Sequence, residues 1–243
     1  MGQLDNRVAI ITGASSGIGK GIAQAFADEG AQVVMVARNR DKLEAAANEI
    51  REMGADVSTI SADITAEADV VRLFQQVNRE YGRLNILINN AGVACGVPAD
   101  ELSLKDWSRV IDTNLTGAFL CCREALRIMK TQGSGRIINI GSVSAKKPRA
   151  FSAPYSASKA GLEGLSRALA LEGREYGVTV CVLHPGNTLS GFWEQTPDLA
   201  SREGVMTPAD VAMMAVTMAA LPDNVLVLES VMLPLKMPFL GRG

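Results

Sequence analysis

The 243-residue sequence contains little histidine, cysteine or aromatic side chain, and these shortages exclude several classes of site. The four cysteines show no spacing typical of a zinc site, and the one histidine, His184, is far in sequence from the adjacent pair Cys121 and Cys122. We therefore predict no metal site and interpret Cys95, Cys121, Cys122 and Cys181 as free, mostly buried thiols. Free thiols are typical of a reducing compartment, so a cytoplasmic location is expected.

The sequence also lacks a long apolar run and a strong net charge. No run reaches the roughly 18 residues that a membrane span requires. The richest stretches, near 213–221 and 225–235, are broken by Pro222, Asp223, Asn224 and Glu229. The N-terminus has no hydrophobic region typical of a signal peptide. The formal net charge of −2 provides no field that would attract nucleic acid or an anionic membrane, so neither is expected as a partner.

What the sequence does contain is an alternation of strand-like and helix-like segments from end to end. β-branched residues are concentrated in runs at 8–11, 32–37, 56–61, 84–89, 135–140 and 178–183, with a seventh run at 225–231. Helical stretches separate them at 18–28, 41–53, 66–81, 107–131 and 155–176. Repeated βα units predict an α/β fold, a Rossmann-type doubly wound parallel sheet of about seven strands with helices on both faces. Because no linker-like segment interrupts the pattern, residues 1–243 are predicted to form a single domain.

The least regular segment is 185–208, which contains scattered glycine, proline, serine and threonine. Its position after the sixth expected strand places it near the carboxyl ends of the strands, where ligands bind in such sheets. A mobile substrate loop and an ordinary surface loop are both consistent with this composition.

A glycine-rich turn, Thr12 to Gly19, follows the first expected strand. Glycines let the backbone turn sharply and approach a pyrophosphate, and the N-terminus of the following helix adds amide donors and a favourable dipole. Between a strand and a helix, this motif predicts a dinucleotide site. The expected contacts are Gly13, Ser15, Ser16, Gly17, Ile18 and Gly19.

The end of the second expected strand should determine which nucleotide is bound. An acidic residue there would bind a ribose 2′-hydroxyl, whereas an arginine accommodates a 2′-phosphate. This sequence has Arg38 and no acidic residue until Asp41, so NADP (NADPH) is favoured over NAD. Arg38 as a simple solvated charge is the alternative. Asp63, just after the third strand, is a candidate acceptor for the adenine amino group, or else an acid near a helix N-cap.

A second group of residues consists of Asn114, Ser142, Tyr155 and Lys159. Tyr155 and Lys159 are four residues apart, so on a helix they share a face about one turn apart. An ammonium beside a phenol favours the phenolate, so the pKa of Tyr155 is expected to lie below its ordinary value of about 10. Tyrosine then becomes a usable general acid or base. Beside a nicotinamide site, such a group predicts redox chemistry between a carbonyl and an alcohol.

Together these motifs resemble the short-chain dehydrogenase/reductase family in its single-domain form, along essentially the whole chain. The resemblance includes the glycine-rich turn, the four-residue group, an Asn-Asn-Ala-Gly element at 89–92 and a Pro-Gly element at 185–186. It implies further cofactor contacts from Ile64, Asn90, Ala91, Gly92, Tyr155, Lys159, Pro185, Gly186, Thr188 and Ser190. The C-terminal sequence resembles a branch that includes NADP-dependent 3-hydroxy acid and serine dehydrogenases.

The resemblance also implies a mechanism. Tyr155 exchanges a proton with the substrate oxygen, and Ser142 orients that oxygen. Lys159 holds the nicotinamide ribose and lowers the pKa of Tyr155, while Asn114 anchors a water molecule that links Lys159 to solvent. A small or medium organic carbonyl is the expected substrate, in a mostly apolar pocket. Its expected lining is Val93, Ala94, Cys95, Val143, Ser144, Phe151, Leu189, Phe192 and Trp193.

Several alternatives stay open at this point. Lys146, Lys147 and Arg149 either include a residue that captures a substrate carboxylate or sulfonate, or form a solvated basic loop. An NAD-dependent dehydrogenase of a hydroxy acid or sugar alcohol, and a non-catalytic nucleotide-binding redox sensor, are the competing functions. Because the family uses helices equivalent to 107–131 and 155–176 for subunit contacts, a homotetramer or homodimer is expected. The apolar segment 232–240 either packs across a neighbouring subunit or near the pocket mouth, or docks on its own domain.

Overall fold

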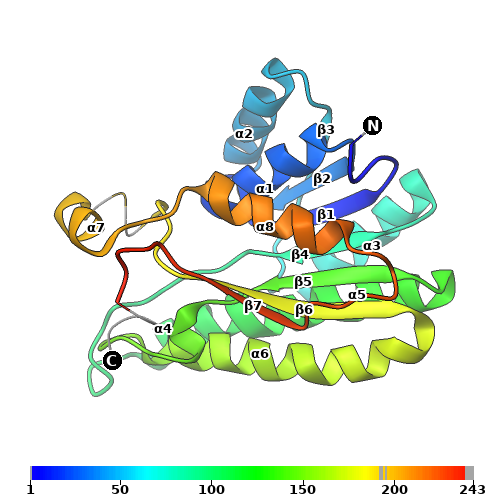
Figure 1. Ribbon diagram of the computed structural model, residues 1–243. Helices are drawn as coiled ribbons and strands as arrows, with labels where there is room; N and C mark the ends of the chain where they lie inside the picture. Colours follow the sequence, from blue (N-terminus) through cyan, green and yellow to red (C-terminus); the bar gives the residue numbers. More distant parts are fainter. Residues whose placement is uncertain (1, 192–193, 195, 239–243) are drawn as a thin grey trace.

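Runs of buried aliphatic residues form the central sheet of the computed structural model, which describes residues 2–191, 194 and 196–238. Strand β1 (Val8–Thr12) is buried along its whole length, as expected for a strand that helices cover on both faces. The other strands are β2 (Gln32–Ala37), β3 (Val57–Ser61), β4 (Ile86–Asn89), β5 (Gly135–Ile140), β6 (Val178–Pro185) and β7 (Glu229–Met232). Within the described residues these seven strands are all parallel, in the order β3-β2-β1-β4-β5-β6-β7 (Figure 1). The predicted Rossmann-type sheet is thereby confirmed.

Helices cover both faces of this sheet. They are α1 (Gly17–Asp28), α2 (Arg40–Glu52), α3 (Glu67–Tyr81), α4 (Leu104–Ile111), α5 (Gly117–Gln132), α6 (Ala153–Gly173), α7 (Pro197–Glu203) and α8 (Pro208–Ala220). The apolar core on one face includes residues of α1, α2 and α8, and the core on the other includes residues of α3, α5 and α6. The chain order reverses between β1 and β4, so the carboxyl ends of these two strands flank the crevice where such sheets bind ligands.

Short polar side chains and glycines determine where several helices begin and end. Asn39 caps α2 by accepting a hydrogen bond from the Lys42 amide (2.9 Å). Thr207 begins α8 in a capping box with Asp210, which satisfies two amides that the first helical turn would leave free. Gly82 ends α3 with φ +68°, in the left-handed region that glycine tolerates best.

The structure corrects two of the predicted elements. The helix expected at 107–131 is instead α4 and α5, joined by a π-helical turn, η1 (Asp112–Thr116). The strand expected at 225–231 is shorter and begins at Glu229, because residues 221–225 form a turn whose carbonyl oxygens face Arg136. The irregular segment 185–208 contains the short helix α7, which the composition did not indicate.

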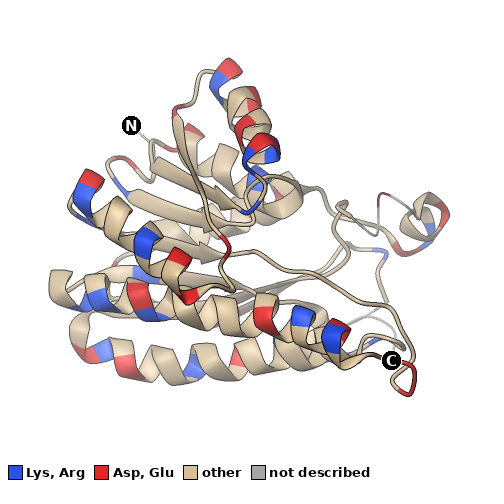
Figure 2. Ribbon diagram, turned by 180° about the vertical axis from the view of Figure 1, so that it is seen from behind, with Lys and Arg blue, Asp and Glu red and all other residues tan. Residues whose placement is uncertain are grey.

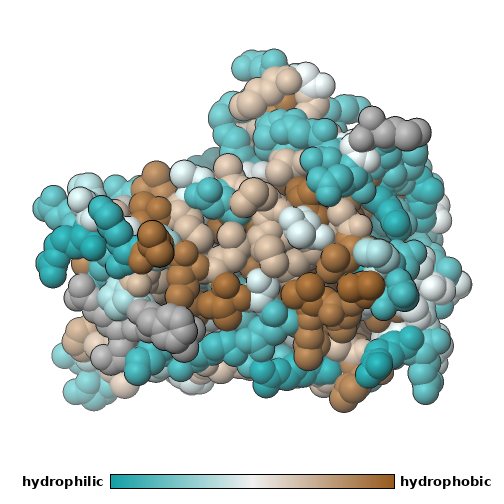
Figure 3. All heavy atoms as spheres, in the orientation of Figure 1, coloured by the Kyte–Doolittle hydropathy of each residue, from teal (hydrophilic) through white to brown (hydrophobic). Residues whose placement is uncertain are grey.

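The surface mixes charge and apolar area. On the side shown in Figure 2, basic and acidic residues are interspersed along the helices. Apolar side chains gather on the face that carries β7 (Figure 3). Val225 and Leu228, just before β7, and Val231, within it, are exposed. No helix among the described residues combines the length and the apolar character that crossing a bilayer requires.

Candidate active site

The turn after β1 is packed so tightly that two of its positions require glycine. Gly13 has φ +65°, and a Cβ atom there would lie 2.7 Å from Ala91 Cα. A Cβ atom on Gly19 would lie 2.3 Å from the Gly13 carbonyl oxygen. Ser16 occupies the N-cap of α1 without capping it through its side chain, so the first amides of the helix keep their capacity to bind an anion. This cradle fits the pyrophosphate of a dinucleotide.

Thr12 and Asn90 join this turn to the end of β4. The Thr12 hydroxyl accepts hydrogen bonds from the amides of Asn90 (3.0 Å) and Ala91 (3.1 Å). In the other direction, the Asn90 side chain donates to the carbonyl oxygens of Thr12 (3.1 Å) and Gly13 (3.2 Å). The Asn90-Ala91-Gly92 element therefore lies directly against the glycine-rich turn, where the sequence places it.

Arg38, predicted to select the nucleotide, and Asp63, predicted to bind its adenine, lie just after β2 and β3. Arg38 is exposed just after β2, and within the described part of the chain its guanidinium makes no hydrogen bond or ion pair. Asp63, after β3, uses one carboxylate oxygen for both the amide and the hydroxyl of Thr65 (3.0 and 2.8 Å). Ile64 is buried against α5, where a Cβ atom on Gly117 would lie 2.9 Å from Ile64 Cδ1.

Residues after β6 reach back to the same turn. Ser190 lies against α1, because a Cβ atom on Gly17 would be 3.0 Å from Ser190 Cβ. Thr188 is buried and bridges to Met206. Gly186 donates its amide hydrogen to Met232 (2.7 Å) and would contact the Met237 sulfur if it carried a Cβ atom. Met232, Leu233 and Met237 of the apolar C-terminal segment thus contact their own chain at Gly186, whereas Leu235 is fully exposed; packing across a neighbouring subunit stays a prediction.

Tyr155, Lys159 and Ser142 meet at the carboxyl end of β5. Tyr155 and Lys159 lie in the first two turns of α6, with Lys159 Nζ 5.7 Å from the centre of the Tyr155 ring. Lys159 is only 4% exposed, and its ammonium donates to the carbonyl oxygen of Ile140 (2.7 Å). Ser142 follows β5, and its hydroxyl accepts a hydrogen bond from the Ser144 amide (3.1 Å).

Burial determines the acidity of this pair. It lowers the pKa of Lys159 to about 8. Burial also raises the pKa of the Tyr155 phenol above its ordinary value, and hydrogen bonding with Ser142 opposes that increase. The prediction that Lys159 holds the pKa of Tyr155 below its ordinary value is therefore wrong for this structure. The physical reason is that desolvation outweighs an ammonium that is directed at the Ile140 carbonyl.

Asn114 lies in η1 and holds the loop after β4. Its amide nitrogen donates to the carbonyl oxygen of Val93 (2.9 Å) and to the Ser158 hydroxyl (3.0 Å), and its oxygen accepts from the Val93 amide (2.8 Å). A Cβ atom on Gly92 would lie 3.4 Å from Asn114 Oδ1 and 3.7 Å from Lys159 Nζ, so these side chains are close neighbours. Because both amide hydrogens are used within the protein, only the oxygen retains capacity to bind water.

The basic loop before Tyr155 is mostly occupied by internal ion pairs. Lys146 pairs with Glu163 and Glu229, which raise its pKa. Arg149 pairs with Glu203 of α7 (2.7 Å) and contacts Asn187 (3.2 Å). The partners of both side chains are too distant in sequence to be anticipated; Lys146 is nevertheless exposed, and Arg149 is half-buried. Lys147 is exposed.

The expected substrate lining is only partly described. Val93, Cys95 and Ser144 are half-buried, Val143 is buried, and Ala94 and Leu189 are exposed. Phe151 is 59% exposed and has φ +63°, a conformation rare outside glycine that occurs preferentially at functional sites. Phe192 and Trp193 lie outside the described residues.

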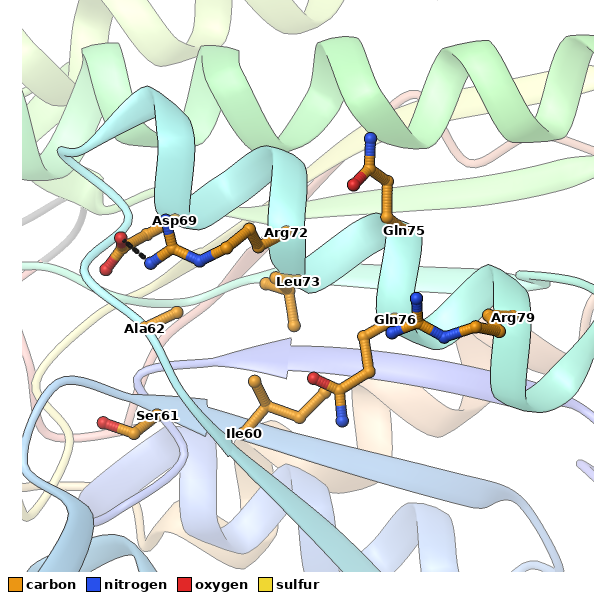
Figure 4. Close-up of a pocket in the computed structure, with 9 residues that line it drawn as sticks. All are labelled: Ile60, Ser61, Ala62, Asp69, Arg72, Leu73, Gln75, Gln76 and Arg79. Carbon is orange, nitrogen blue, oxygen red and sulfur yellow. Dashed lines mark hydrogen bonds and ion pairs between the residues drawn. The ribbon is translucent and has the colours of Figure 1, made fainter.

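A separate surface pocket lies between β3 and α3 and has a volume of about 310 Å³ (Figure 4). The residues that line it are Ile60, Ser61, Ala62, Asp69, Arg72, Leu73, Gln75, Gln76 and Arg79. None of them belongs to the predicted cofactor or catalytic sets, so this pocket is not the site assembled above.

Sequence reasoning missed three residues of the site. Thr12 was included as the first residue of the glycine-rich turn, but not as the residue whose hydroxyl joins β1 to β4. Ser158, within the Tyr-Ser-Ala-Ser-Lys segment, binds Asn114. His184, considered above only as a metal ligand, contacts the main chain of Ser142. A polar residue at the end of a buried strand was the available signal for Thr12 and His184.

Comparisons with known proteins agree with this geometry. A family model described as short chain dehydrogenase matches residues 7–199. The chain is 36% identical over 197 residues to a 3beta-hydroxysteroid dehydrogenase of Mediterraneibacter gnavus, covering 81% of this chain and 71% of that protein. It is 39% identical over 195 residues to the (2S)-[(R)-hydroxy(phenyl)methyl]succinyl-CoA dehydrogenase subunit BbsD of Thauera aromatica, covering 80% and 78%.

A solved structure is also similar along nearly the whole chain. It is a metagenomic short-chain oxidoreductase in complex with NADP, with a TM-score of 0.85 and 32% identity. The similarity covers 96% of this chain and 98% of that one.

Proposed function

The chain belongs to the short-chain dehydrogenase family, and from this premise we propose that it is an NADP(H)-dependent oxidoreductase that interconverts an aldehyde or ketone and the corresponding alcohol. One observation carries the proposal: Ser142, Tyr155 and Lys159 converge at the carboxyl end of β5. A turn that fits a dinucleotide lies two strands away at the end of β1. A proton-transfer group and a cofactor site are the two parts that carbonyl reduction requires.

In this proposal each residue of the site has a separate role in the reaction. A bound nicotinamide cofactor supplies or accepts the hydride. Tyr155 donates a proton to the substrate oxygen in reduction and removes it in oxidation. Ser142 donates a hydrogen bond to the same oxygen and holds it beside the phenol. Lys159, with N–H donors beyond the one directed at Ile140, binds the ribose hydroxyls of the cofactor. Asn114 holds the Val93 loop against this group.

The cofactor contacts are proposed from the cradle and its surroundings. They comprise Gly13, Ser15, Ser16, Gly17, Ile18, Gly19, Arg38, Asp63, Ile64, Asn90, Ala91, Gly92, Tyr155, Lys159, Pro185, Gly186, Thr188 and Ser190. Arg38 supports the choice of NADP, because it is exposed at the end of β2 with free donors for a 2′-phosphate. The complex of a similar protein with NADP supports the same choice. A single domain, a substrate loop at 185–208, a cytoplasmic location and a homotetramer or homodimer stay predictions.

The test is oxidation of NADPH and of NADH, followed by absorbance, against a panel of aldehydes, ketones and carboxylated or sulfonated carbonyls. We expect turnover with NADPH and little with NADH. Tyr155→Phe should lower turnover by about 10²-fold or more while cofactor binding persists. Tyr176→Phe removes an exposed phenol far from the site and should change neither. Binding of both cofactors with no turnover on any substrate would support the redox sensor instead.

Cofactor preference has its own test. Arg38→Asp removes the proposed phosphate contact and adds an acid that suits a 2′-hydroxyl, so the ratio of kcat/KM for NADPH to that for NADH should fall by at least about tenfold. Arg40→Asp makes the same charge change on a neighbouring exposed arginine and is the matched control. If the ratio of kcat/KM for NADPH to that for NADH is unchanged in Arg38→Asp, Arg38 is a solvated charge that does not contact the cofactor. That result would favour the NAD-dependent alternative.

A further inference from the structure

His184, the one histidine of the sequence, is completely buried directly behind Ser142. Its Nδ1 atom lies 3.1 Å from the Ser142 amide nitrogen and 2.9 Å from the Ser142 carbonyl oxygen. The packing is close, because a Cβ atom on Gly141 would lie 2.5 Å from the same nitrogen. The imidazole therefore touches the main chain of the residue that carries the proposed substrate-orienting hydroxyl.

The other edge of the ring faces two carboxylates. Within the described residues His184 Nε2 makes no hydrogen bond, but it lies 3.5 Å from Glu163 Oε2 on α6 and 3.8 Å from Glu229 Oε1 on β7. Lys146 and Arg167 each pair with both acids. The cluster is therefore neutralised by the protein's own cations, and the Lys146 ammonium already bridges the carboxylates. This arrangement favours a role for the histidine itself rather than for a bound metal ion.

The carboxylates determine which ring nitrogen carries the hydrogen. Carboxylate oxygens accept hydrogen bonds but cannot donate them, so an unprotonated Nε2 would direct its lone pair at negative charge. A hydrogen on Nε2 relieves that repulsion and leaves Nδ1 as an acceptor for the Ser142 amide. Nδ1 then also faces the Ser142 carbonyl oxygen at 2.9 Å, but the partial charge of one carbonyl repels a lone pair less than two full carboxylate charges do. Burial lowers the pKa of His184 below its ordinary value of 6.5, which keeps the ring neutral at pH 7.

We propose that His184 is a positioning residue: Glu163 and Glu229 hold it in the Nε2–H tautomer, and it accepts a hydrogen bond from the Ser142 amide that fixes the Ser142 hydroxyl beside Tyr155. The consequence for turnover rests on the proposed function, whereas the tautomer and its link to Ser142 do not. The serine is then held from two sides, since its hydroxyl also accepts from the Ser144 amide.

The first experiment uses the fact that the sequence contains a single histidine. Nitrogen NMR of untagged protein labelled with ¹⁵N-histidine gives one imidazole, whose two nitrogens report tautomer and titration directly. We expect a hydrogen on Nε2 and none on Nδ1 at pH 7, with a titration midpoint below 6.5. A hydrogen on Nδ1, donated to the Ser142 carbonyl, would overturn the proposal. Because no substrate is needed, this result is independent of the proposed function.

Charge variants test the facing groups in opposite directions. Glu163→Gln removes a carboxylate that stabilises the protonated ring, so the midpoint should fall. Lys146→Met removes a cation that destabilises it, so the midpoint should rise. Shifts of the same sign in both variants, or no shift in either, would show that this cluster does not control His184.

Variants of the histidine then test the link to turnover. His184→Asn retains an acceptor near the position of Nδ1, whereas His184→Gln places its amide nearer to Nε2. We expect Asn to retain most of kcat and Gln to lose roughly tenfold to a hundredfold with KM little changed. Wild-type kcat should also fall at acid pH as the ring is protonated, and this limb should vanish in His184→Asn. Equal losses in both variants with an unchanged pH profile would indicate a merely structural role. Wild-type protein without turnover on any substrate would contradict the proposed function, and the NMR result would still decide the tautomer.

Discussion

Two buried cations lie at opposite ends of β5, and the protein binds them in different ways. Arg136, near the start of the strand, is 5% exposed and donates to the carbonyl oxygens of Leu221, Pro222 and Val225 at 3.1–3.3 Å. Lys159, at the other end, is 4% exposed and donates to Ile140 at 2.7 Å. Burial lowers the pKa of both side chains. They differ in how many protein acceptors replace the lost water.

This difference distinguishes a cation that the fold binds from a cation that is a candidate for ligand binding. Removing a charge from water is costly unless hydrogen bonds replace the solvent. Arg136 finds three carbonyl oxygens in one turn and fastens the segment between α8 and β7 to the sheet. An ammonium has three hydrogens, and among the described residues Lys159 directs one of them at a hydrogen-bond acceptor. A buried charge with so few hydrogen-bond acceptors from the protein is a candidate for binding a ligand.

The largest expected effect comes from removing the functional cation. Lys159→Met should lower turnover by about 10²–10⁴-fold, because the cofactor ribose loses the ammonium proposed to bind and orient it beside Tyr155. Stability should be retained or increase, since a costly buried charge is gone. Steady-state kinetics together with urea unfolding measures both, and Lys147→Met, on an exposed neighbouring lysine, is the control. Full activity in Lys159→Met would contradict the proposed role of Lys159 in the site.

The structural cation should give the reverse pattern. Arg136→Met leaves three carbonyl oxygens without their donor, which should lower the free energy of unfolding by about 3 kcal/mol. Turnover per folded molecule should stay near the wild-type value, because Arg136 lies at the end of the sheet away from the site. Urea unfolding compares this variant with Arg83→Met, which changes an exposed arginine just before β4. If Arg136→Met loses activity but not stability, the interpretation that Arg136 has a structural role and lies outside the site is contradicted.

The smallest expected effect is a pH dependence of stability. The folded state releases the Lys159 proton near pH 8, whereas the unfolded chain keeps it to about pH 10.4. Between these values the unfolded state binds more protons, so the free energy of unfolding rises with pH. From pH 7.5 to 9.5 wild-type protein should gain about 2 kcal/mol relative to Lys159→Met. Urea unfolding at both values measures the gain, and parallel curves for the two proteins would place the pKa of Lys159 near its ordinary value.

The sequence was sufficient for the sheet, which depends on local patterns, and it named the residues that the structure brings together at the carboxyl ends of β1, β4 and β5. Buried β-branched runs and glycines at a strand end are visible in single segments. The π-helical turn around Asn114 was not, because the groups that Asn114 binds there, the Val93 main chain and the Ser158 hydroxyl, come from distant parts of the chain. The ion pairs of Lys146 and Arg149 were missed because Glu229 and Glu203 come from distant parts of the chain. The acidity of Tyr155 was mispredicted because burial cannot be read from neighbours in sequence.

The bridge between Thr12 and Asn90 also constrains the order of folding. The glycine-rich turn follows the first strand and is held partly by β2, through the Ala14 amide and the Val36 carbonyl oxygen (3.1 Å), yet the hydrogen bonds to Thr12 and Gly13 come from residues just after β4. Pairings between distant segments close long loops and form slowly. A nascent chain that ends after β3 would contain every glycine of the motif but lack the contacts from Asn90 and Ala91. We therefore expect the turn to reach its final shape only when β4 pairs with β1.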